Sequence, residues 1–245
     1  MGQVELSFVI PAYNEEIYIQ DTLGTLDMAI KKNALEYEIV VVDDGSRDKT
    51  YTKALQYARK NGHVRVIRYA RNTGKGFAIK TGVMESVGDI VIFVDGDMEI
   101  DLNTVSRYVE ALEKADIVIA TKWHHDSKVS MPFSRKLLSR AFNVLVRILI
   151  GFSMKDTQVG LKVMKRCAVD KIFPRLAVKR YAFDVELLAV AHLYGIKTVE
   201  MPVKLKLASS FKLKDTWHMF VDLLGIAYRL RIIRWYQRQV SSLVK

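Results

Sequence analysis

The stretch YEIVVVDDGS, residues 37–46, decides the fold, because a continuous apolar run ends there in two acids and a turn. A strand buried on both faces has this pattern, whereas a strand with one solvated face alternates apolar and polar residues. Similar Val- and Ile-rich runs occur at 5–11, 64–70, 89–95 and 116–121, separated by segments with helical apolar spacing. The alternation predicts an α/β protein with a doubly wound, mostly parallel sheet flanked by helices. Ligands of such sheets bind beyond the carboxyl ends of the strands.

The second half of the chain has a different character. SRKLLSRAFNVLVRILIG, residues 134–151, has the pattern of a basic amphipathic helix. KTVEMPVKLKLASS, residues 197–210, is strand-like and predicts a return to the sheet. DTWHMFVDLLGIAYRLRIIRWYQRQV, residues 215–240, predicts one long terminal helix. We therefore expect a main domain over residues 1–214 and a C-terminal basic amphipathic helix within residues 215–245.

Charge is distributed unevenly along this chain of net charge +11: residues 1–121 carry −5 and residues 122–245 carry +16. The basic half suits an anionic partner, and the acidic half argues against a plain nucleic-acid-binding module, so we expect no nucleic acid partner. The lone Cys167 excludes an intramolecular disulfide and fits a reducing compartment. No stretch has the length of a transmembrane helix or the pattern of a signal peptide. We expect a cytoplasmic protein, or one that lies on a membrane without spanning it.

The stretch VIFVDGDMEID, residues 91–101, gathers acids where a buried strand ends. Asp95, Asp97 and Glu99 would repel one another on one turn unless a cation lay between them. Hard oxygen ligands suit Mg²⁺ or Mn²⁺, which commonly connect a protein to the phosphates of a substrate. The alternative is an acidic, solvated loop.

Polar residues also follow the first two strands. In PAYNEE, Pro11, Tyr13 and Glu15 lie where a strand meets a helix, so that the ring could stack on a base. Asp43 and Asp44 could accept hydrogen bonds from a base or a ribose. The alternatives are a strand stop with a helix cap at the first position, and a turn with a cap at the second.

The stretch RNTGKGFAIKTG places glycines on both sides of Lys75. It matches neither a Walker A loop nor a dinucleotide fingerprint, which argues against an ATPase or a dehydrogenase. Small residues beside one lysine still suit the close approach of a phosphorylated ligand.

Taken together and in this order, VIPAYNEE, VVDDGSRDKT, GKGFAIKTG and VDGD resemble the family 2 glycosyltransferases, which have the GT-A fold. DTQVGLKVMKR, RYAFDVELLAVAHLYG, VEMPVK and SSFKL resemble the dolichyl- (polyprenyl-) phosphate sugar synthases, most closely the glucosyltransferase branch. The match extends to about residue 215, so the resemblance makes residues 1–214 the catalytic domain.

The resemblance implies roles for the matching positions. The donor nucleotide would be held by Pro11, Tyr13, Glu15, Asp43, Asp44, Lys75, Asp95 and Lys122. The metal, Mg²⁺ or Mn²⁺, would be held by the D-x-D pair Asp95 and Asp97, with Asp97 the direct ligand, and by Glu99. The acceptor phosphate would be held by Arg135, Arg140, Ser210 and Lys212. The catalytic position would be Asp156.

The implied reaction is inverting transfer of a hexose, glucose from UDP-glucose, to dolichyl or polyprenyl phosphate. Its alternatives are a GDP-mannose-dependent mannose synthase, a transferase with another acceptor, and a non-catalytic binding protein. A departing nucleoside diphosphate needs a Lewis acid rather than a proton. Because a lipid phosphate is already anionic, a strong general base is hardly needed, and Asp156 would orient the acceptor or sugar as much as remove a proton.

A lipid acceptor implies contact with a bilayer, which we expect at the cytoplasmic face of a membrane, directly or through a membrane-anchored partner protein. On a continuous terminal helix Arg231, Arg234 and Arg238 would share one face beside Trp235 and Tyr236, which are interfacial residue types. The alternative is that the amphipathic helices pack on the α/β core.

Other charged residues are expected to be structural. His124 and His125 lack the spacing of a metal pair and are expected to be loop residues. Asp184 and Glu186 open a helix and are expected to interact with its positive end, or with Arg180.

Overall fold

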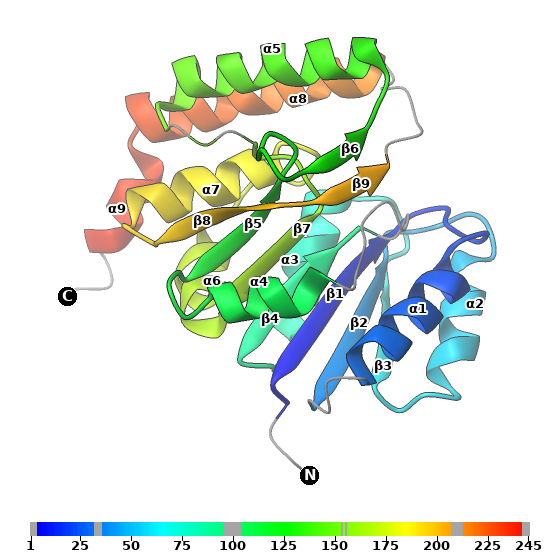
Figure 1. Ribbon diagram of the computed structural model, residues 1–245. Helices are drawn as coiled ribbons and strands as arrows, with labels where there is room; N and C mark the ends of the chain where they lie inside the picture. The colour runs from blue at the N-terminus through cyan, green and yellow to red at the C-terminus, as the bar shows by residue number, and fades with distance from the viewer. Residues whose placement is uncertain are drawn as a thin grey trace.

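A seven-stranded sheet forms the centre of the computed structural model, which describes residues 4–31, 36–95, 104–152, 154, 156–206 and 213–241. The strand order is β3-β2-β1-β4-β7-β5-β8, as Figure 1 shows. The strands are β1 (Leu6–Ala12), β2 (Tyr37–Asp43), β3 (Val64–Arg68), β4 (Ile90–Val94), β5 (Ile117–Thr121), β7 (Leu161–Lys165) and β8 (Thr198–Pro202).

The sheet is mostly parallel, as the sequence predicts. β1 pairs in parallel with β2 and β4, β2 with β3, and β5 with β8. The exception is β7, which lies antiparallel between β4 and β5. β4 and β5 therefore run in the same direction, and their carboxyl ends reach the same edge of the sheet.

Helices cover both faces of the sheet. One apolar core contains β-strand residues such as Ile39 and Val41, together with side chains of α1 (Ile19–Lys31), α2 (Thr50–Ala58) and α4 (Val105–Ala111). The neighbouring Val40 and Val42 point to the opposite core. That second core is covered by α3 (Lys75–Glu85), α6 (Arg166–Ile172), the short 3₁₀ helix η2 (Phe173–Arg175) and α7 (Phe183–Leu193). The continuous Val and Ile runs are explained by this burial on both sides.

Beyond α7 lies an outer pair of helices, α5 (Phe133–Ile150) and α8 (Leu213–Ala227), which run side by side in Figure 1. Each buries one stripe: Val146 of α5 and Leu223 of α8 belong to the same core as α7. The short parallel strands β6 (Lys128–Ser130) and β9 (Lys204–Lys206) lead toward this pair. The domain boundary at residue 214 stays a prediction, although residues on both sides of it share one core.

The prediction of one continuous terminal helix is wrong. α8 passes into a π-helical turn, η3 (Tyr228–Ile232), and the chain then turns at Arg234, whose φ is 49°, before α9 (Trp235–Ser241). Tyr236 is fully buried because its hydroxyl donates to Glu186. The three arginines 231, 234 and 238 therefore do not line one helical face, and Tyr236 is not an interfacial residue. Within the described residues, every helix is too short or too polar to cross a bilayer.

Candidate active site

The first group of site residues lies at the carboxyl end of β2. Asp43 is fully buried, and its Oδ1 accepts a hydrogen bond from the Ser46 N–H at 3.3 Å. Arg68, at the end of β3, places Nε 3.1 Å from Asp43 Oδ2 and its guanidinium 4.5 Å from the Tyr51 ring centroid. Sequence reasoning missed Arg68 and Tyr51, because the pairing of β2 with β3 brings Arg68 to Asp43 and Tyr51 reaches Arg68 from α2.

Asp44 holds a loop rather than facing an open site. Its two oxygens accept the backbone N–H groups of Thr73 at 2.7 Å and Gly74 at 2.8 Å. Burial raises the pKa of this carboxyl above its usual value, and the neighbouring Asp43 raises it further. The two backbone hydrogen bonds lower the pKa but do not cancel the rise. Asp44 therefore positions the loop from which α3 begins at Lys75.

Lys75 and Asp95 form an ion pair, with Nζ 2.6 Å from Oδ1. Asp95 follows β4, and its backbone N–H donates to the carbonyl of Gly160 at 3.2 Å. A β-carbon added at Gly160 would overlap the Asp95 carboxylate. The close approach of the two segments therefore requires a glycine here. Asp97 and Glu99, the other predicted metal ligands, lie outside the described residues.

The turn after β1 is tied to the turn after β2. The Asn14 N–H donates to Ser46 Oγ at 3.0 Å, and the Glu15 N–H donates to Thr50 Oγ1 at 2.7 Å. Ser46 and Thr50 therefore tie the two turns together, whereas the N-cap position of α2, Lys49, makes no side-chain capping bond. Tyr13 remains 41% exposed at the end of β1, so its ring is accessible for stacking.

Lys122 and Asp156 form a buried pair beyond the end of β5. Asp156 is fully buried and Lys122 nearly so, with Nζ 3.2 Å from Asp156 Oδ2 and 3.3 Å from Oδ1. The same carboxylate accepts the backbone N–H of Lys122 at 3.0 Å and that of Gln158 at 3.1 Å. The Asp156 N–H donates to Glu200 Oε1 at 3.1 Å. Asp156 thus fixes both the backbone and the side chain of Lys122.

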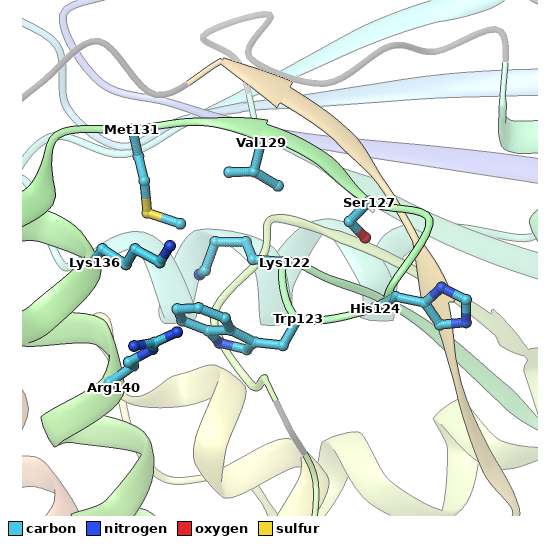
Figure 2. A pocket seen from close by; sticks show the side chains of 8 residues that line it. All are labelled: Lys122, Trp123, His124, Ser127, Val129, Met131, Lys136 and Arg140. Carbon is cyan, nitrogen blue, oxygen red and sulfur yellow. The ribbon is translucent and has the colours of Figure 1, made fainter.

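A pocket of about 320 Å³ opens beside this pair (Figure 2). Three cationic side chains line it, Lys122, Lys136 and Arg140, and their ends point toward one another. The Arg140 guanidinium lies 5.1 Å from the ring centroid of Trp123. The whole lining consists of Lys122, Trp123, His124, Ser127, Val129, Met131, Lys136 and Arg140, so no carboxylate takes part in it. A cavity with three cations, three apolar side chains (Trp123, Val129 and Met131) and no acid in its lining suits a phosphate that carries an apolar group.

The structure brings together only some of the predicted acceptor residues. Lys122, which the resemblance assigns to the donor nucleotide, lines the pocket instead. Arg140 lines it as well, whereas Arg135 does not. Lys136 takes its place because residues four apart share a helix face and residues five apart do not. The 3.6-residue repeat around Arg140 could have identified Lys136. Ser210 and Lys212 lie outside the described residues.

His124, His125 and Asp126 cluster on the loop after β5. The two rings stack at 4.3 Å, and His125 Nε2 lies 3.1 Å from Asp126 Oδ2. One ligand atom from each residue lies within 4.8 Å of the others, so the group could hold a metal ion. His125 and Asp126 are exposed, and His124 is half-buried.

Asp184 and Glu186 lie in the first turn of α7, as predicted, but their partners lie on other segments of the fold. Asp184 Oδ1 accepts a 2.7 Å hydrogen bond from the buried Lys162, whose Nζ lies 5.0 Å from the Phe93 ring centroid. Glu186 is fully buried and accepts the N–H groups of residues 177 and 178, as well as the Tyr236 hydroxyl. Both carboxylates therefore join α7 to segments distant in sequence.

Residues 7–173 match the family described as glycosyl transferase family 2. The chain belongs to this family. A dolichyl-phosphate β-glucosyltransferase of Homo sapiens is 33% identical over 98% of this chain and 80% of its own length. A Trichomonas vaginalis protein with the same activity name is 34% identical over 94% of this chain and 76% of its own. The resemblance to the glucosyltransferase branch, drawn from the sequence motifs, is confirmed.

A solved structure shares the fold of this family 2 glycosyltransferase. Glucosyl-3-phosphoglycerate synthase from Mycobacterium tuberculosis, in complex with Mn²⁺, UDP and phosphoglyceric acid, has a TM-score of 0.71. The two sequences are 20% identical, and the match covers 92% of this chain and 79% of the synthase. The likeness confirms the predicted GT-A architecture.

Proposed function

We propose that this protein transfers glucose from UDP-glucose to the phosphate of dolichyl phosphate or a related polyprenyl phosphate, with inversion at the anomeric carbon. The observation that carries the proposal is the pocket lined by Lys122, Lys136 and Arg140 beside Trp123 and apolar side chains. Its cations match a phosphate monoester, and its apolar walls match the first carbons of a lipid chain. The names of the relatives specify the same donor sugar and the same acceptor.

The donor belongs at the carboxyl ends of β1, β2 and β4. Asp43 and the exposed ring of Tyr13 suit a nucleoside, and Lys75 beside Asp95 suits a diphosphate. Because β4 and β5 end at the same edge, Asp95 and Lys122 lie on the same side of the sheet. Donor diphosphate and acceptor phosphate can then meet across the amino end of β7, which lies between the carboxyl ends of β4 and β5.

The acids after β4 fit a divalent cation. Gly160 fixes the place of the Asp95 carboxylate, and two further carboxylates follow in sequence, Asp97 and Glu99. Asp95, Asp97 and Glu99 would hold Mg²⁺ or Mn²⁺, which would stabilise the charge of the leaving diphosphate as a Lewis acid. Lys75, at 2.6 Å from Asp95, supplies a fixed positive charge at the same place.

Replacing Asp97 with asparagine tests the metal ligand set. The change removes a charged oxygen ligand and keeps the side chain's shape, so we expect transfer to fall to background and UDP binding to lose its dependence on Mn²⁺. Isothermal titration of UDP with and without Mn²⁺ measures the second effect. Full activity of this variant, or of the wild type after EDTA treatment, would contradict the ligand assignment.

The remaining chemistry falls to the cations of the pocket. The attacking oxygen of the acceptor phosphate is ionised near neutral pH, so this nucleophile needs orientation rather than deprotonation. Asp156 already accepts hydrogen bonds from Lys122 and Gln158, and its burial leaves it no open side. We therefore assign Asp156 the positioning of Lys122, in place of the two roles expected from the sequence, which were to orient the acceptor or sugar and to remove a proton.

Charge reversal within α5 tests the acceptor pocket. Lys136→Glu and Arg140→Glu should each raise the KM for dolichyl phosphate by about tenfold or more, because a charge-assisted hydrogen bond contributes about 1.5–3 kcal/mol. The KM for UDP-glucose should change little. The assay measures transfer of labelled glucose from UDP-glucose into an organic extract.

Arg135→Glu is the matched control, since it reverses a charge on the same helix outside the pocket lining. Its effect on the acceptor KM should be the smallest of the three. A larger effect of Arg135→Glu than of Lys136→Glu would move the acceptor phosphate away from this pocket.

We place the reaction at the cytoplasmic face of a membrane, where the protein would be peripheral. The lipid acceptor requires a bilayer within reach of the pocket. Whether the protein meets that bilayer directly or through a membrane-anchored partner depends on the surface around α5 and α8.

A further inference from the structure

The helix α5, which supplies two cations to the pocket, also exposes an apolar stripe. Phe133, Leu137, Val144 and Ile148 are between 51% and 80% exposed. Their spacing of four, seven and four residues keeps them on one face of the helix. The opposite face is buried in the core at Val146. More than half of the surface of each of these four residues is therefore left uncovered by the described fold.

The neighbouring helix shows a second stripe of the same kind. Trp217, Val221 and Leu224 of α8, and Tyr228 directly after it, are between 43% and 64% exposed. Their spacing of four, three and four residues again selects one helix face, while Leu223 is buried on the inner side. α5 and α8 lie side by side in the outermost layer (Figure 1). We therefore treat their two exposed stripes as one surface, which we call the apolar face.

A basic row borders the apolar face. Lys136, Arg140 and Arg147 are spaced four and seven residues apart, so they follow one side of α5 next to its apolar stripe. The 18 residues of α5 contain no acid. The first two cations of the row also line the pocket, so the apolar face continues directly into the candidate acceptor site.

We infer that the apolar face docks on an anionic phospholipid bilayer and so presents the mouth of the pocket to the lipid surface. The inference rests on the proposed function, since it names the surface from which the lipid phosphate enters. Apolar side chains would enter the boundary between headgroups and acyl chains, with Trp217 and Tyr228 at the level that such rings favour. The basic row would meet anionic headgroups. This replaces the surface first expected from Arg231, Arg234 and Arg238.

Vesicle flotation tests the inference. Wild-type protein should float with phosphatidylcholine vesicles that contain about a quarter phosphatidylserine, and should leave them as salt rises, because salt screens the headgroup charge. Leu137→Gln combined with Val221→Gln removes one apolar side chain from each stripe and should lower the bound fraction about tenfold or more.

Met28→Gln combined with Val87→Gln is the matched control. Both side chains are more than 60% exposed, and both lie outside α5 and α8. This variant should bind vesicles as the wild type does. Both double variants should keep wild-type turnover on a short, water-soluble polyprenyl phosphate, and only the first should lose activity on a long-chain acceptor in vesicles.

Three outcomes overturn the docking surface. The first is that the wild type remains in the lipid-free fraction at low salt. The second is that the Leu137→Gln, Val221→Gln variant binds vesicles as well as the wild type. The third is that gel filtration shows a dimer that only this double variant loses, which would make the face an interface between two copies. Failure of the wild type to glucosylate even the short acceptor would instead overturn the proposed function. The two failures are therefore distinguishable.

Discussion

Replacement of Gly160 by alanine is expected to abolish transfer and to weaken UDP binding by at least about a hundredfold, equivalent to roughly 3 kcal/mol. The new β-carbon would overlap the Asp95 carboxylate, whose backbone N–H already donates to the Gly160 carbonyl. The Asp95 side chain is short, so it cannot move away from the new β-carbon without breaking its ion pair with Lys75. Titration of UDP in the presence of Mn²⁺ measures the loss.

Gly24→Ala is the matched control for this experiment. Gly24 lies within α1, and a β-carbon there meets nothing within 4 Å. Alanine is the better helix former by about 1 kcal/mol, so this variant should be slightly more stable and fully active. Wild-type UDP affinity and activity in Gly160→Ala would show that the position of Asp95 does not define the donor site.

Asp156→Asn is expected to lower turnover at least about a hundredfold and to reduce the free energy of unfolding by about 3–5 kcal/mol. The change removes the countercharge of Lys122, a lysine that is only 7% exposed in its side chain. The asparagine amide would also present a donor where the carboxylate accepts N–H groups of Lys122 and Gln158. Denaturant unfolding and steady-state transfer assays measure the two losses, and UDP affinity should stay near the wild-type value.

A second substitution separates positioning from proton transfer. Adding Lys122→Met to Asp156→Asn removes the unpaired buried charge, so stability should recover in part while activity stays low. Lys122→Met alone should raise the acceptor KM about tenfold or more, because one cation of the pocket is lost. An unchanged acceptor KM in Lys122→Met, with activity lost only in Asp156→Asn, would restore Asp156 as a group that acts on substrate directly.

Local patterns account for the part of this fold that sequence reasoning predicted. β2 was predictable because its four apolar residues between Glu38 and Asp43 are buried without a polar interruption, as are the apolar run of β5 and, after its first residue, that of β4. The acids at the ends of β2 and β4 were predictable as site residues because strand ends in a doubly wound sheet converge on one edge.

Long-range pairing accounts for what was missed. The antiparallel β7 brings Gly160 against Asp95, and a contact over 65 positions leaves no local signature. Lys162 resembles a surface lysine in sequence, yet it is buried because Asp184 of α7 neutralises it. Tyr236 resembles an interfacial residue, yet after the chain turns at Arg234 its hydroxyl donates to the buried Glu186. Each buried polar group depends on a partner that only the tertiary fold supplies.

The most direct test of the central claim is a comparison of two donors with one acceptor. Purified protein is incubated with Mn²⁺, dolichyl phosphate and either labelled UDP-glucose or labelled GDP-mannose, and the organic extract is counted. The account predicts label from UDP-glucose in the lipid fraction, dependent on dolichyl phosphate and sharply reduced in Lys136→Glu. Label from GDP-mannose alone, or extraction of label that is independent of dolichyl phosphate, would contradict it.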